Sequence, residues 1–466
     1  MFGSMVSRRK HKPQFAFLSK RLELLALMAL HAFPAIHYPS STATLSTPAA
    51  ILDQICRENL RAGLAAMPLW ERTLTILIWP PAMVLWGVGL TLANGAHVAR
   101  RYRHGRIGQF ADQMRLAFTR GIPVSYFYTF ELHDPHRQAH AHEYLLRGQI
   151  KGGGQLYKSL YQKYPERSEP ARILNDKLAF HRFCTDHGLP TAQLFAVVDR
   201  GSFSWIDRDR SQVPQVDLFF KPRKECGGTG AERWRFADDG YLGHRGDRLD
   251  AKGLTKRLAR LSRRQPYLVF ECLANHPDLQ DLSAGALSTL RIHTILNEKY
   301  EVEHLFTMLR MSQFRRRIID TADGIAAAVD PATGVLGIAS NSSLLARWMT
   351  NHPATRARII GRQVPYWPEA LDLAISTHRK LASPFIVGWD IAVTQHGPVI
   401  IEANKSPDIE IEQRLNGPWG NSRFGELLMH HLTGPTGTGK DTAQYLANEV
   451  AEEHASPPTN VENLCC

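Results

Sequence analysis

The sequence contains little cysteine, and its six cysteines form no metal-binding or disulfide pattern. They lie at positions 56, 184, 226, 272, 465 and 466, with no C-x-x-C pair matched by a second pair. This spacing excludes a zinc-ribbon-like site and a secreted disulfide framework, and it is typical of reduced thiols in the cytosol. Cys465 and Cys466 do not form a C-a-a-X box, so they carry little weight as a lipidation signal.

Acidic residues are scarce in the N-terminal region. Residues 1–106 hold thirteen Lys and Arg but only four Asp and Glu, a net charge of +9, which leaves +3 for the other 360 residues of a chain with net charge +12. This basic excess lies beside apolar runs, where contact with a membrane surface explains it better than a nucleic-acid groove. The sequence has no zinc-finger spacing and no RNA-binding aromatic motif, so no nucleic-acid partner is expected.

The chain also lacks a Ser-His-Asp or Cys-His motif, so nothing indicates a covalent mechanism through a protein nucleophile. It does have the composition of a folded protein, with 466 residues of which 44% are hydrophobic and 21% charged. These shares are ordinary for a globular protein, and the length predicts two or three compact units.

The N-terminal region contains two apolar runs. Residues 22–36 are apolar except for Glu23 and His31, but they are short for a membrane span and Pro34 interrupts them. They resemble the apolar part of a signal peptide, although no clean cleavage site follows. Residues 73–93 form the stronger run, which carries no charge over 21 residues and is followed by Arg100, Arg101, Arg103 and Arg106.

This second run predicts membrane association, with its C-terminal side in the cytoplasm. Trp79 and Trp86 suit a membrane interface, but Pro80 and Pro81 remove backbone donors and would kink or reverse the chain. A full span, a re-entrant or interfacial hairpin, and a buried helical hairpin of a soluble protein all remain open. The expected location is the cytoplasmic face of the inner membrane, with a soluble cytoplasmic protein as the alternative.

From residue 173 onward, a series of predicted helices and strands indicates a mixed α+β fold. A helix capped by Asn175 or Asp176 and ended at Gly188 leads into a strand. Further strands are predicted over residues 216–221, 267–273, 288–296 and 304–311, further helices over 254–263 and 368–381, and a hairpin turn at 330–334. These elements do not alternate strictly, which favours α+β over a parallel α/β sheet.

Residues 386–404 carry the most distinctive chemistry. Two strands joined by a tight turn at 395–397 are predicted there, with Asp390 in the first strand. Glu402 and Asn404 end the second strand two residues apart, so they point to the same face. Two carboxylates and an amide oxygen suit Mg²⁺ that carries nucleotide phosphates, although this pattern alone also fits an acidic hairpin tip in solvent.

The run WDIAVTQHGPVIIEANKSPD resembles the metal-binding hairpin of ATP-grasp ligases, of which D-alanine–D-alanine ligase is a familiar member. The resemblance covers roughly residues 140–432 and implies that Asp390, Glu402 and Asn404 hold magnesium. It also implies two lysines that contact the phosphates of ATP, Lys177 in NDKLAFHRFCTDHGLPT and Lys221 in LFFKPRKECGGTGA. An ammonium group on rigid structure balances phosphate charge, and loop N–H groups cradle a phosphate, here those around Gly227, Gly228 and Gly230.

The segment YLVFECLANHPDL resembles the hinge strand of the same family. The resemblance implies that Glu271 receives the adenine amino group and that the backbone of Cys272 and Leu273 takes the edge of the ring. It implies that Asp278, seven residues after Glu271, holds the ribose hydroxyls. Cys272 also fits a buried apolar residue, and both interpretations hold together because only its backbone would make the contact.

The strand STLRIHT contributes the candidate catalytic residue. Arg291 matches an arginine of the family that faces the phosphates or the acyl intermediate. His293 lies two residues further on the same face, and it is interpreted as a core histidine with satisfied hydrogen bonds, not as a base.

Four runs together resemble the sugar-transfer-associated ATP-grasp family, which is linked by inference to cell-surface polysaccharides: LRIHT, VDPATGVLG, HPATRARIIGRQVPYWPEAL and GWDIA…GPVIIEAN. The resemblance implies two α+β subdomains that clamp ATP, preceded by a helical, membrane-associated region. The expected divisions are residues 1–109 for that region, 110–200 leading into the ATP-grasp fold, 201–432 for its core, and 433–466 for a linker and flexible tail. Asp408 follows Pro407 where many ligases have glycine, so the acceptor pocket is not carried over.

A second phosphate-loop candidate is set aside. GPTGTGK at residues 434–440 resembles a Walker A loop, but Asp441 stands where Ser or Thr should ligate magnesium. A helical run precedes it where a strand is required, so no phosphate site is expected there.

The sequence therefore predicts an ATP- and Mg²⁺-dependent ligase that joins a carboxylate to an amine or thiol through an acyl phosphate. The amine is expected to be an amino sugar or an amino acid destined for a cell-surface glycan. An ATP-grasp kinase or phosphotransferase is one alternative, and a non-catalytic, nucleotide-binding membrane scaffold is another.

Overall fold

A computed structural model describes residues 47–168, 170–224, 230–243, 246–283, 285–314, 324–381 and 384–434. The chain divides into two compact units. One comprises residues 1–158, 343–347 and 408–426, and the other comprises residues 159–342, 348–407 and 427–466. The domain boundaries expected near residues 109, 200 and 432 stay predictions. Residues 1–46 lie outside the described residues, as does the expected linker and tail except for residues 433 and 434.

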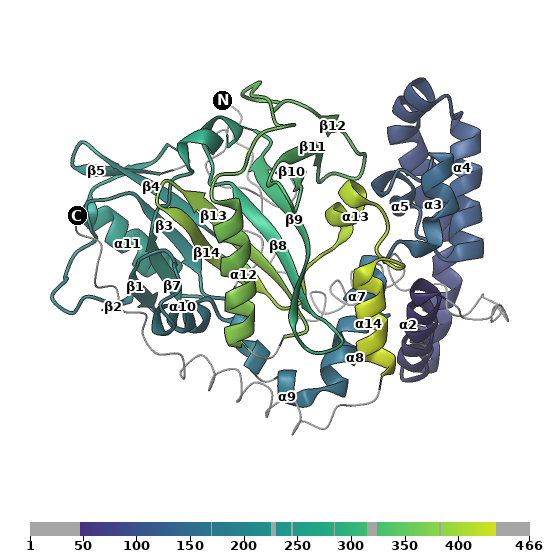
Figure 1. The fold of residues 1–466 in the computed structure, drawn as a ribbon, viewed down its shortest axis with the longest axis horizontal. Helices are drawn as coiled ribbons and strands as arrows, with labels where there is room; N and C mark the ends of the chain where they lie inside the picture. The colour runs from purple at the N-terminus through teal and green to yellow at the C-terminus, as the bar shows by residue number, and fades with distance from the viewer. Residues whose placement is uncertain are drawn as a thin grey trace, which may run out of the picture. The chain divides into compact units, whose positions relative to one another are not determined.

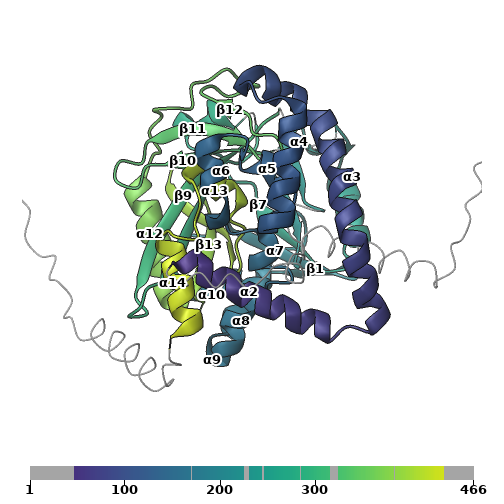
Figure 2. The same cartoon turned by 90° about the vertical axis from the view of Figure 1, so that its right-hand side faces the viewer.

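The first unit is helical. Its longer elements are α2 (Pro48–Ala65), α3 (Leu69–Tyr102) and α4 (Arg106–Arg115), and α4 continues into a π-helical turn, η1 (Leu116–Arg120). Figure 2 shows α3 and α4 side by side. Short helices complete the unit: α5 (Ser125–Thr129), α6 (Pro135–Ala139), η2 (Ala141–Glu143), α7 (Arg147–Ile150) and α13 (Glu410–Asn416). Aromatic side chains around Phe127 and Phe130 fill its centre.

The apolar run at residues 73–93 lies within α3, which continues through Pro80 and Pro81 without reversing. The hairpin considered for this run is therefore wrong. The prolines cost backbone hydrogen bonds, but Trp79 and Met83 on either side of them are fully buried and hold the helix in place. Among the described residues, α3 is the one helix long and apolar enough to cross a membrane, and only 28% of its most apolar window is buried.

The second unit contains two antiparallel sheets of seven strands each, which confirms the α+β class (Figure 1). The first sheet has the order β2-β1-β7-β3-β4-β5-β6. Its strands are β1 (Leu194–Asp199), β2 (Ser202–Trp205), β3 (Leu218–Pro222), β4 (Glu232–Ala237), β5 (Gly240–Gly243), β6 (Arg248–Leu249) and β7 (Tyr267–Glu271). Helix α11 (Ala251–Leu261) packs its buried leucines on one face, and α10 (Lys177–Asp186) packs Leu178 on the other.

The second sheet has the order β12-β11-β10-β9-β8-β13-β14. Its strands are β8 (Thr289–Leu296), β9 (Val302–Ser312), β10 (Gly324–Val329), β11 (Leu336–Asn341), β12 (Trp348–Met349), β13 (Ile386–Thr394) and β14 (Gly397–Asn404). Helix α12 (Trp367–Leu381) covers one face, where it meets an apolar core that includes Ile292 and Trp389. Because side chains alternate along a strand, Arg291 and Asp390 lie on the opposite face.

Shorter elements connect these layers: α8 (Leu156–Lys163), α9 (Pro165–Ser168), η3 (Pro170–Asn175), η4 (Pro277–Leu282) and α14 (Arg423–Thr433). The predicted turn at residues 330–334 joins β10 to β11. There Asp330 accepts hydrogen bonds from the backbone of Thr333, and Gly334 adopts a φ of 74° that favours glycine.

Candidate functional site

Charged side chains form a row across one face of the second sheet. Arg291 on β8 stands directly opposite Asp390 on β13, and Asp390 stands directly opposite Glu402 on β14. Residues opposite each other in an antiparallel pair point to the same face. Arg310 on β9 joins the row, because it lies two residues beyond Met308, the partner of Arg291. Four adjacent strands therefore bring two guanidinium groups and two carboxylates to one surface.

Arg291 holds Asp390 through both carboxylate oxygens. Its Nε donates to Oδ1 at 2.8 Å and its second terminal nitrogen donates to Oδ2 at 2.9 Å, while Arg310 approaches Oδ1 at 3.6 Å. This is the two-pronged geometry in which an arginine fixes a carboxylate most firmly. Burial alone would raise the pKa of Asp390, but the two guanidinium groups outweigh it and hold the pKa below its usual value.

Glu402 and Asn404 lie at the end of β14 and are both half-buried. Glu402 Oε2 is 3.6 Å from the Nζ atom of Lys177. Asn404 stands opposite Gly388, and its position two residues from Glu402 places both on the face that carries Asp390. The three predicted metal ligands thus share one face of the hairpin.

Lys177 is positioned by the start of α10. Asp176 caps this helix by accepting hydrogen bonds from the N–H groups of Leu178 and Ala179, which confirms one of the two predicted caps. The same carboxylate pairs with Arg223 at the end of β3, with its two oxygens 2.8 and 2.9 Å from Nε. The helix start and the strand end are therefore fastened together beside Lys177.

Lys221 lies on β3 and reaches from the first sheet to the second. Its Nζ donates to the carbonyl of Ile401 on β14 at 3.3 Å and sits 4.6 Å from the centre of the Phe270 ring. Burial lowers the pKa of Lys221 to about 8, although the nearby carboxylates of Glu402 and Asp390 raise it, and the charge of Lys177 lowers it further. Its charge is thus easily lost in the absence of an anion.

The predicted hinge lies at the end of β7, next to β3. The carboxylate of Glu271 accepts a hydrogen bond from the N–H of Gln193 at 2.8 Å, and the N–H of Cys272 donates to Asp217 at 3.0 Å. Cys272 is half-buried and not part of the core, and burial raises the pKa of its thiol. Cys272 and Leu273, whose backbone is predicted to contact adenine, follow directly after the last residue of β7. Their predicted contacts with adenine stay predictions.

The remaining residues predicted to contact the nucleotide are Asp278 and the glycines of the phosphate loop. The side chain of Asp278, in η4, is 69% exposed and lies 3.7 Å from the ring of His276, so it is accessible to a ligand. Gly230 has a φ of 75°, which favours glycine, and its carbonyl accepts a hydrogen bond from Tyr267. Gly227 and Gly228 lie outside the described residues, as does the Walker-like run beyond Gly434.

Sequence reasoning missed Arg310 and Arg223. Arg310 lies in no motif, and Arg223 lies in the Lys221 run but was given no role there. The importance of Arg310 depends on strand register, and that of Arg223 on a contact between distant segments, which the sequence does not reveal. His293, interpreted as a core histidine with satisfied hydrogen bonds, is fully buried on β8, and its hydrogen bonding stays a prediction.

The row fits a magnesium ion by its donor chemistry. In the described part of the chain, no three His, Cys, Asp or Glu side chains are close enough together to hold a metal. Asp390 and Glu402 with the amide oxygen of Asn404 supply a mixed oxygen set, and Mg²⁺ in nucleotide sites commonly takes one or two carboxylates together with phosphate oxygens. Each carboxylate oxygen has two lone pairs, so the pairing with Arg291 leaves acceptor positions on Asp390.

Residues 155–423 match the model of the sugar-transfer associated ATP-grasp family. Similar solved structures include an N5-carboxyaminoimidazole ribonucleotide synthetase in its ADP complex, at 11% identity and a TM-score of 0.32, over 56% of this chain and 52% of that one. They also include D-alanine–D-alanine ligase from Bacillus anthracis, at 12% identity and a TM-score of 0.32, over 61% and 71%.

A third similar structure is the ATP-grasp ligase PsnB with a precursor peptide and AMPPNP, at 15% identity and a TM-score of 0.32, over 65% of this chain and 73% of that one. The chain spans about half of the length of the N5-carboxyaminoimidazole ribonucleotide synthetase that it matches. No curated protein matches the chain.

Proposed function

Because this chain belongs to the sugar-transfer associated ATP-grasp family, we propose that it is an ATP- and Mg²⁺-dependent ligase that joins a carboxylate to an amine. The observation that carries this proposal is the row of charged side chains on the second sheet, faced by two lysines. Lys177 approaches Glu402 at 3.6 Å, and Lys221 reaches the same strand, β14. Cations for phosphate and oxygen ligands for a metal therefore meet at one place.

The proposed reaction has two steps. An oxygen of the substrate carboxylate attacks the γ-phosphorus of ATP, the bond from that phosphorus to the β–γ bridging oxygen breaks, and ADP leaves with an acyl phosphate remaining. The nitrogen of the amine then attacks the acyl carbon, the bond from that carbon to the phosphate oxygen breaks, and orthophosphate leaves while the nitrogen loses a proton. Neither step requires a nucleophile from the protein.

The residues of the site supply charge and position. Lys177 and Lys221 would offset the negative charge of the phosphates, and Arg291 would stabilise charge that develops on the transferred group. Arg291 also fixes the orientation of Asp390 through its two hydrogen bonds. A magnesium ion, held by Asp390, Glu402 and Asn404, would neutralise phosphate charge and orient the oxygens.

The proposed biological setting is the synthesis of cell-surface glycans. The family description supports a link to sugar transfer, and an amino sugar or amino acid is the proposed amine. The exposed apolar residues of α3 support a location at the membrane, on the cytoplasmic side where ATP is available. A thiol acceptor in place of the amine would leave the first step unchanged.

Hydroxylamine trapping tests the ligase chemistry directly. The protein is incubated with Mg²⁺, ATP, hydroxylamine and single carboxylates from a panel of amino acids and uronic acids, and hydroxamate and ADP are measured. An acyl phosphate would give hydroxamate in amounts equal to ADP. Asp390→Asn should lower both by at least about tenfold, because it weakens the Arg291 pairing and the metal site, whereas the exposed Glu369→Gln should change neither.

A stable phosphorylated product without hydroxamate would contradict the ligase and establish a kinase or phosphotransferase. ATP binding without turnover across the panel, in a protein that unfolds cooperatively, would favour the scaffold.

A further inference from the structure

One side of α3 is a continuous apolar surface. Leu77, Leu85 and Leu92 are 66%, 72% and 65% exposed, and they recur at intervals of seven or eight residues, which correspond to two turns of a helix. We call this surface the α3 apolar face; it consists of Leu77, Ile78, Val84, Leu85, Val88 and Leu92. No charged residue occurs in the helix between Thr73 and Ala93. An exposed apolar surface of this length marks a site of contact with a membrane or a protein.

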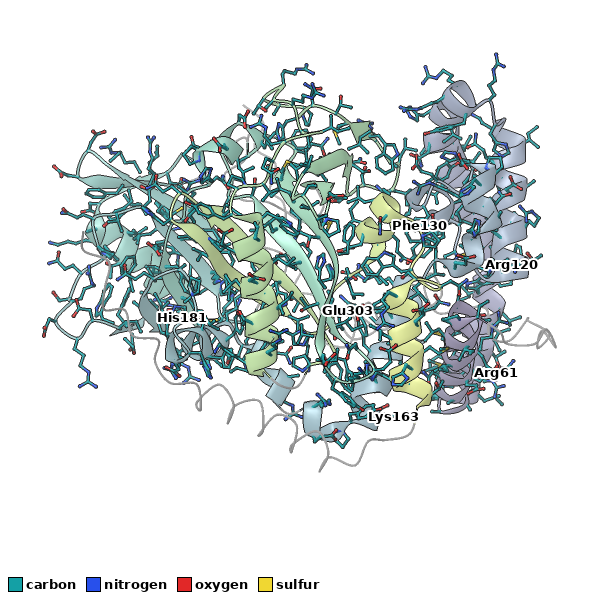
Figure 3. All side chains as sticks on the ribbon, in the orientation of Figure 1. Arg61, Arg120, Phe130, Lys163, His181 and Glu303 are labelled. Carbon is teal, nitrogen blue, oxygen red and sulfur yellow. The ribbon has the colours of Figure 1, made fainter. Side chains whose placement is uncertain are left out.

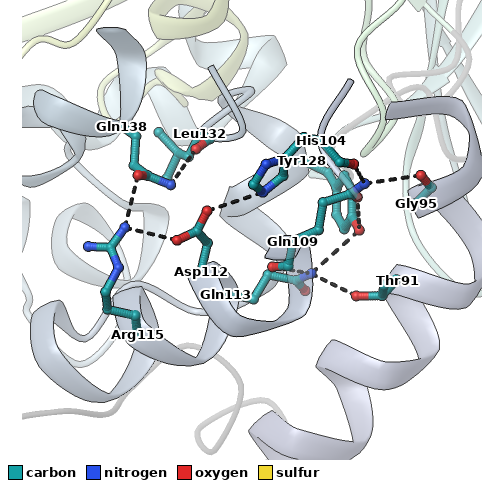
Figure 4. A network of polar contacts seen from close by, with 10 residues as sticks. All are labelled: Thr91, Gly95, His104, Gln109, Asp112, Gln113, Arg115, Tyr128, Leu132 and Gln138. Carbon is teal, nitrogen blue, oxygen red and sulfur yellow. Dashed lines mark hydrogen bonds and ion pairs between the residues drawn. The ribbon is translucent and has the colours of Figure 1, made fainter. Parts of the chain in front are cut away.

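The opposite side of α3 is packed within the first unit. The residues buried there recur every four positions: Thr75, Trp79, Met83, Gly87, Thr91 and Gly95. Figure 4 shows how polar groups of α4 meet this side. Gln113 donates to the hydroxyl of Thr91 at 2.8 Å, and Gln109 donates to the carbonyl of Gly95 at 3.1 Å. Both glutamines are fully buried, so these contacts fasten α4 firmly to α3.

This packing places charged groups beside the middle of α3. A Cβ on Gly87 would lie 2.6 Å from Met114, and the ring of Trp79 lies 5.4 Å from the ring of Phe118. Gly87 and Trp79 are each about 6 Å along the helix from the centre of the uncharged run. The segment beside them also carries Arg115 and Arg120, both of which are exposed. Figure 3 labels Arg120 on this helical unit.

A transmembrane position for α3 would therefore carry Arg115 and Arg120 into the hydrocarbon layer, where each charge is costly. Asp112 would follow, because it pairs with Arg115 at 3.1 Å. A helix that lies in the plane of the membrane avoids this cost, since its apolar face meets lipid while α4 stays on the aqueous side. The helix is also about 51 Å long, well beyond the hydrocarbon thickness of a bilayer.

Charge identifies the surface that suits this helix. Exposed Arg100, Arg101, Arg103 and Arg106 follow the apolar face. Exposed arginines next to an apolar surface favour a bilayer that contains anionic lipids over a neutral protein partner. Trp70 and Trp86 are also more than one-third exposed on α3, and tryptophan prefers the interface between headgroups and hydrocarbon.

We propose that α3 lies in the plane of an anionic membrane surface, with the α3 apolar face toward the lipid, and that it does not cross the bilayer. This proposal rests on the membrane location proposed above and gives it an orientation. It does not depend on the ligase activity.

Cysteine accessibility distinguishes the two orientations in the full chain. Arg72→Cys and Arg101→Cys place a thiol near each end of α3, and each change removes one charge. Sealed spheroplasts of a bacterial expression host are treated with a membrane-impermeant maleimide, with the wild-type chain as the control for its own cysteines. The expected result is no added label at either site until the cells are permeabilised, and then label at both. Label at one site in sealed cells would establish a span and overturn the proposal. Label at both sites in sealed cells would place both ends of α3 outside the cytoplasm, and it would also overturn the proposal.

Vesicle binding tests the contact itself. The purified chain is sedimented with vesicles of phosphatidylcholine with and without phosphatidylglycerol. Binding should require phosphatidylglycerol, and Leu85→Glu should weaken it by roughly tenfold or more. Ile206→Glu, a change at an exposed apolar residue of the second unit, should bind as the wild type does.

Cooperative urea unfolding of both variants, at the midpoint of the wild type, shows that they are folded. Unchanged vesicle binding by Leu85→Glu would overturn the proposal. Self-association of the wild type in solution, lost in Leu85→Glu and without vesicle binding, would overturn it in favour of an interface between two copies. Either failure would leave the hydroxamate assay, and hence the ligase proposal, unaffected.

Discussion

Lys221 is a cation in a buried position, where a charge is energetically unfavourable. Burial lowers its pKa to about 8, while the carboxylates of Glu402 and Asp390 favour the charged form. A phosphate placed near its Nζ atom would favour the charged form further and raise the pKa. Binding of ATP at this position, as proposed, would therefore be coupled to the protonation of Lys221.

This coupling predicts a pH dependence of ATP binding. Below pH 8 Lys221 is already protonated in the free protein, so affinity should be constant. Above pH 8 binding must take up a proton, so affinity should fall by up to about tenfold per pH unit. Calorimetry between pH 7 and 9.5 measures this slope. Lys221→Arg is the matched variant, because its charge does not titrate in this range, and it should lose the slope. An equal slope in both proteins would assign the titration to another group.

For single residues, the sequence predicts well which type of side chain the site needs, but it says little about which groups surround that side chain. The spacing of Glu402 and Asn404 predicts that these two residues share one face of a strand. The register of β13 and β14 places Asp390 directly opposite Glu402, on that same face. The sequence could not reveal that Arg310 approaches Asp390 at 3.6 Å, because that contact depends on the register of β9 against β8.

Among the elements, the β13–β14 hairpin depends on a close approach at Gly388. A Cβ at this position would lie 2.7 Å from the Cβ of Pro407 and 3.3 Å from a terminal nitrogen of Arg291. The backbone of β13 therefore passes close to the guanidinium group that holds Asp390. A side chain at residue 388 would have to displace either the segment after β14 or Arg291.

Gly388→Ala should therefore disturb both stability and the site. Steric overlap of this kind typically lowers the free energy of unfolding by about 1–3 kcal/mol, and displacement of Arg291 should weaken Mg²⁺-dependent ATP binding. Urea unfolding and calorimetry measure the two effects. Gly337→Ala on β11 of the same sheet is the control, because a Cβ there would meet only a carbonyl at 3.6 Å. A fully stable Gly388→Ala that binds ATP normally would show that the overlap is relieved without moving Arg291.

Local signals predicted several elements well and one poorly. The cap of α10 at Asp176 and the turn at residues 330–334 follow from side-chain hydrogen bonds and backbone angles that neighbouring residues determine. Pro80 and Pro81 suggested a reversal, yet α3 continues through them. The buried stripe that includes Trp79 and Met83 outweighs the lost hydrogen bonds, and such tertiary packing is not visible in the proline pair itself.

Across the whole molecule, the division into units could not be derived from sequence. Residues 408–426 belong to the helical unit although they follow the hairpin of the other unit within four residues of Asn404. Arg414 shows why: its fully buried guanidinium group donates to the carbonyls of Thr129 at 2.7 Å and Ser343 at 2.8 Å. These contacts join three distant segments of the first unit, and no local pattern announces them.

The candidate site, in contrast, lies entirely within the second unit, whose segments follow the order expected from the ATP-grasp resemblance. Lys177, Lys221, Arg291 and Asp390 come from four separate elements, and each was identified from a short run of sequence. In the structure Lys177 lies near Glu402, Lys221 contacts the same strand, and Arg291 pairs with Asp390 on the neighbouring strand, as the proposed ATP site requires.

The proposed metal site is tested most directly by calorimetry of ATP binding to the full chain, with and without Mg²⁺, in wild type and in Glu402→Gln. Mg²⁺ should strengthen ATP binding in the wild type, and Glu402→Gln should reduce that magnesium effect by at least about tenfold. The exposed Glu369→Gln should behave as the wild type does. Equal magnesium dependence in wild type and Glu402→Gln would contradict the metal site, and no ATP binding by a cooperatively folded wild type would contradict the enzyme.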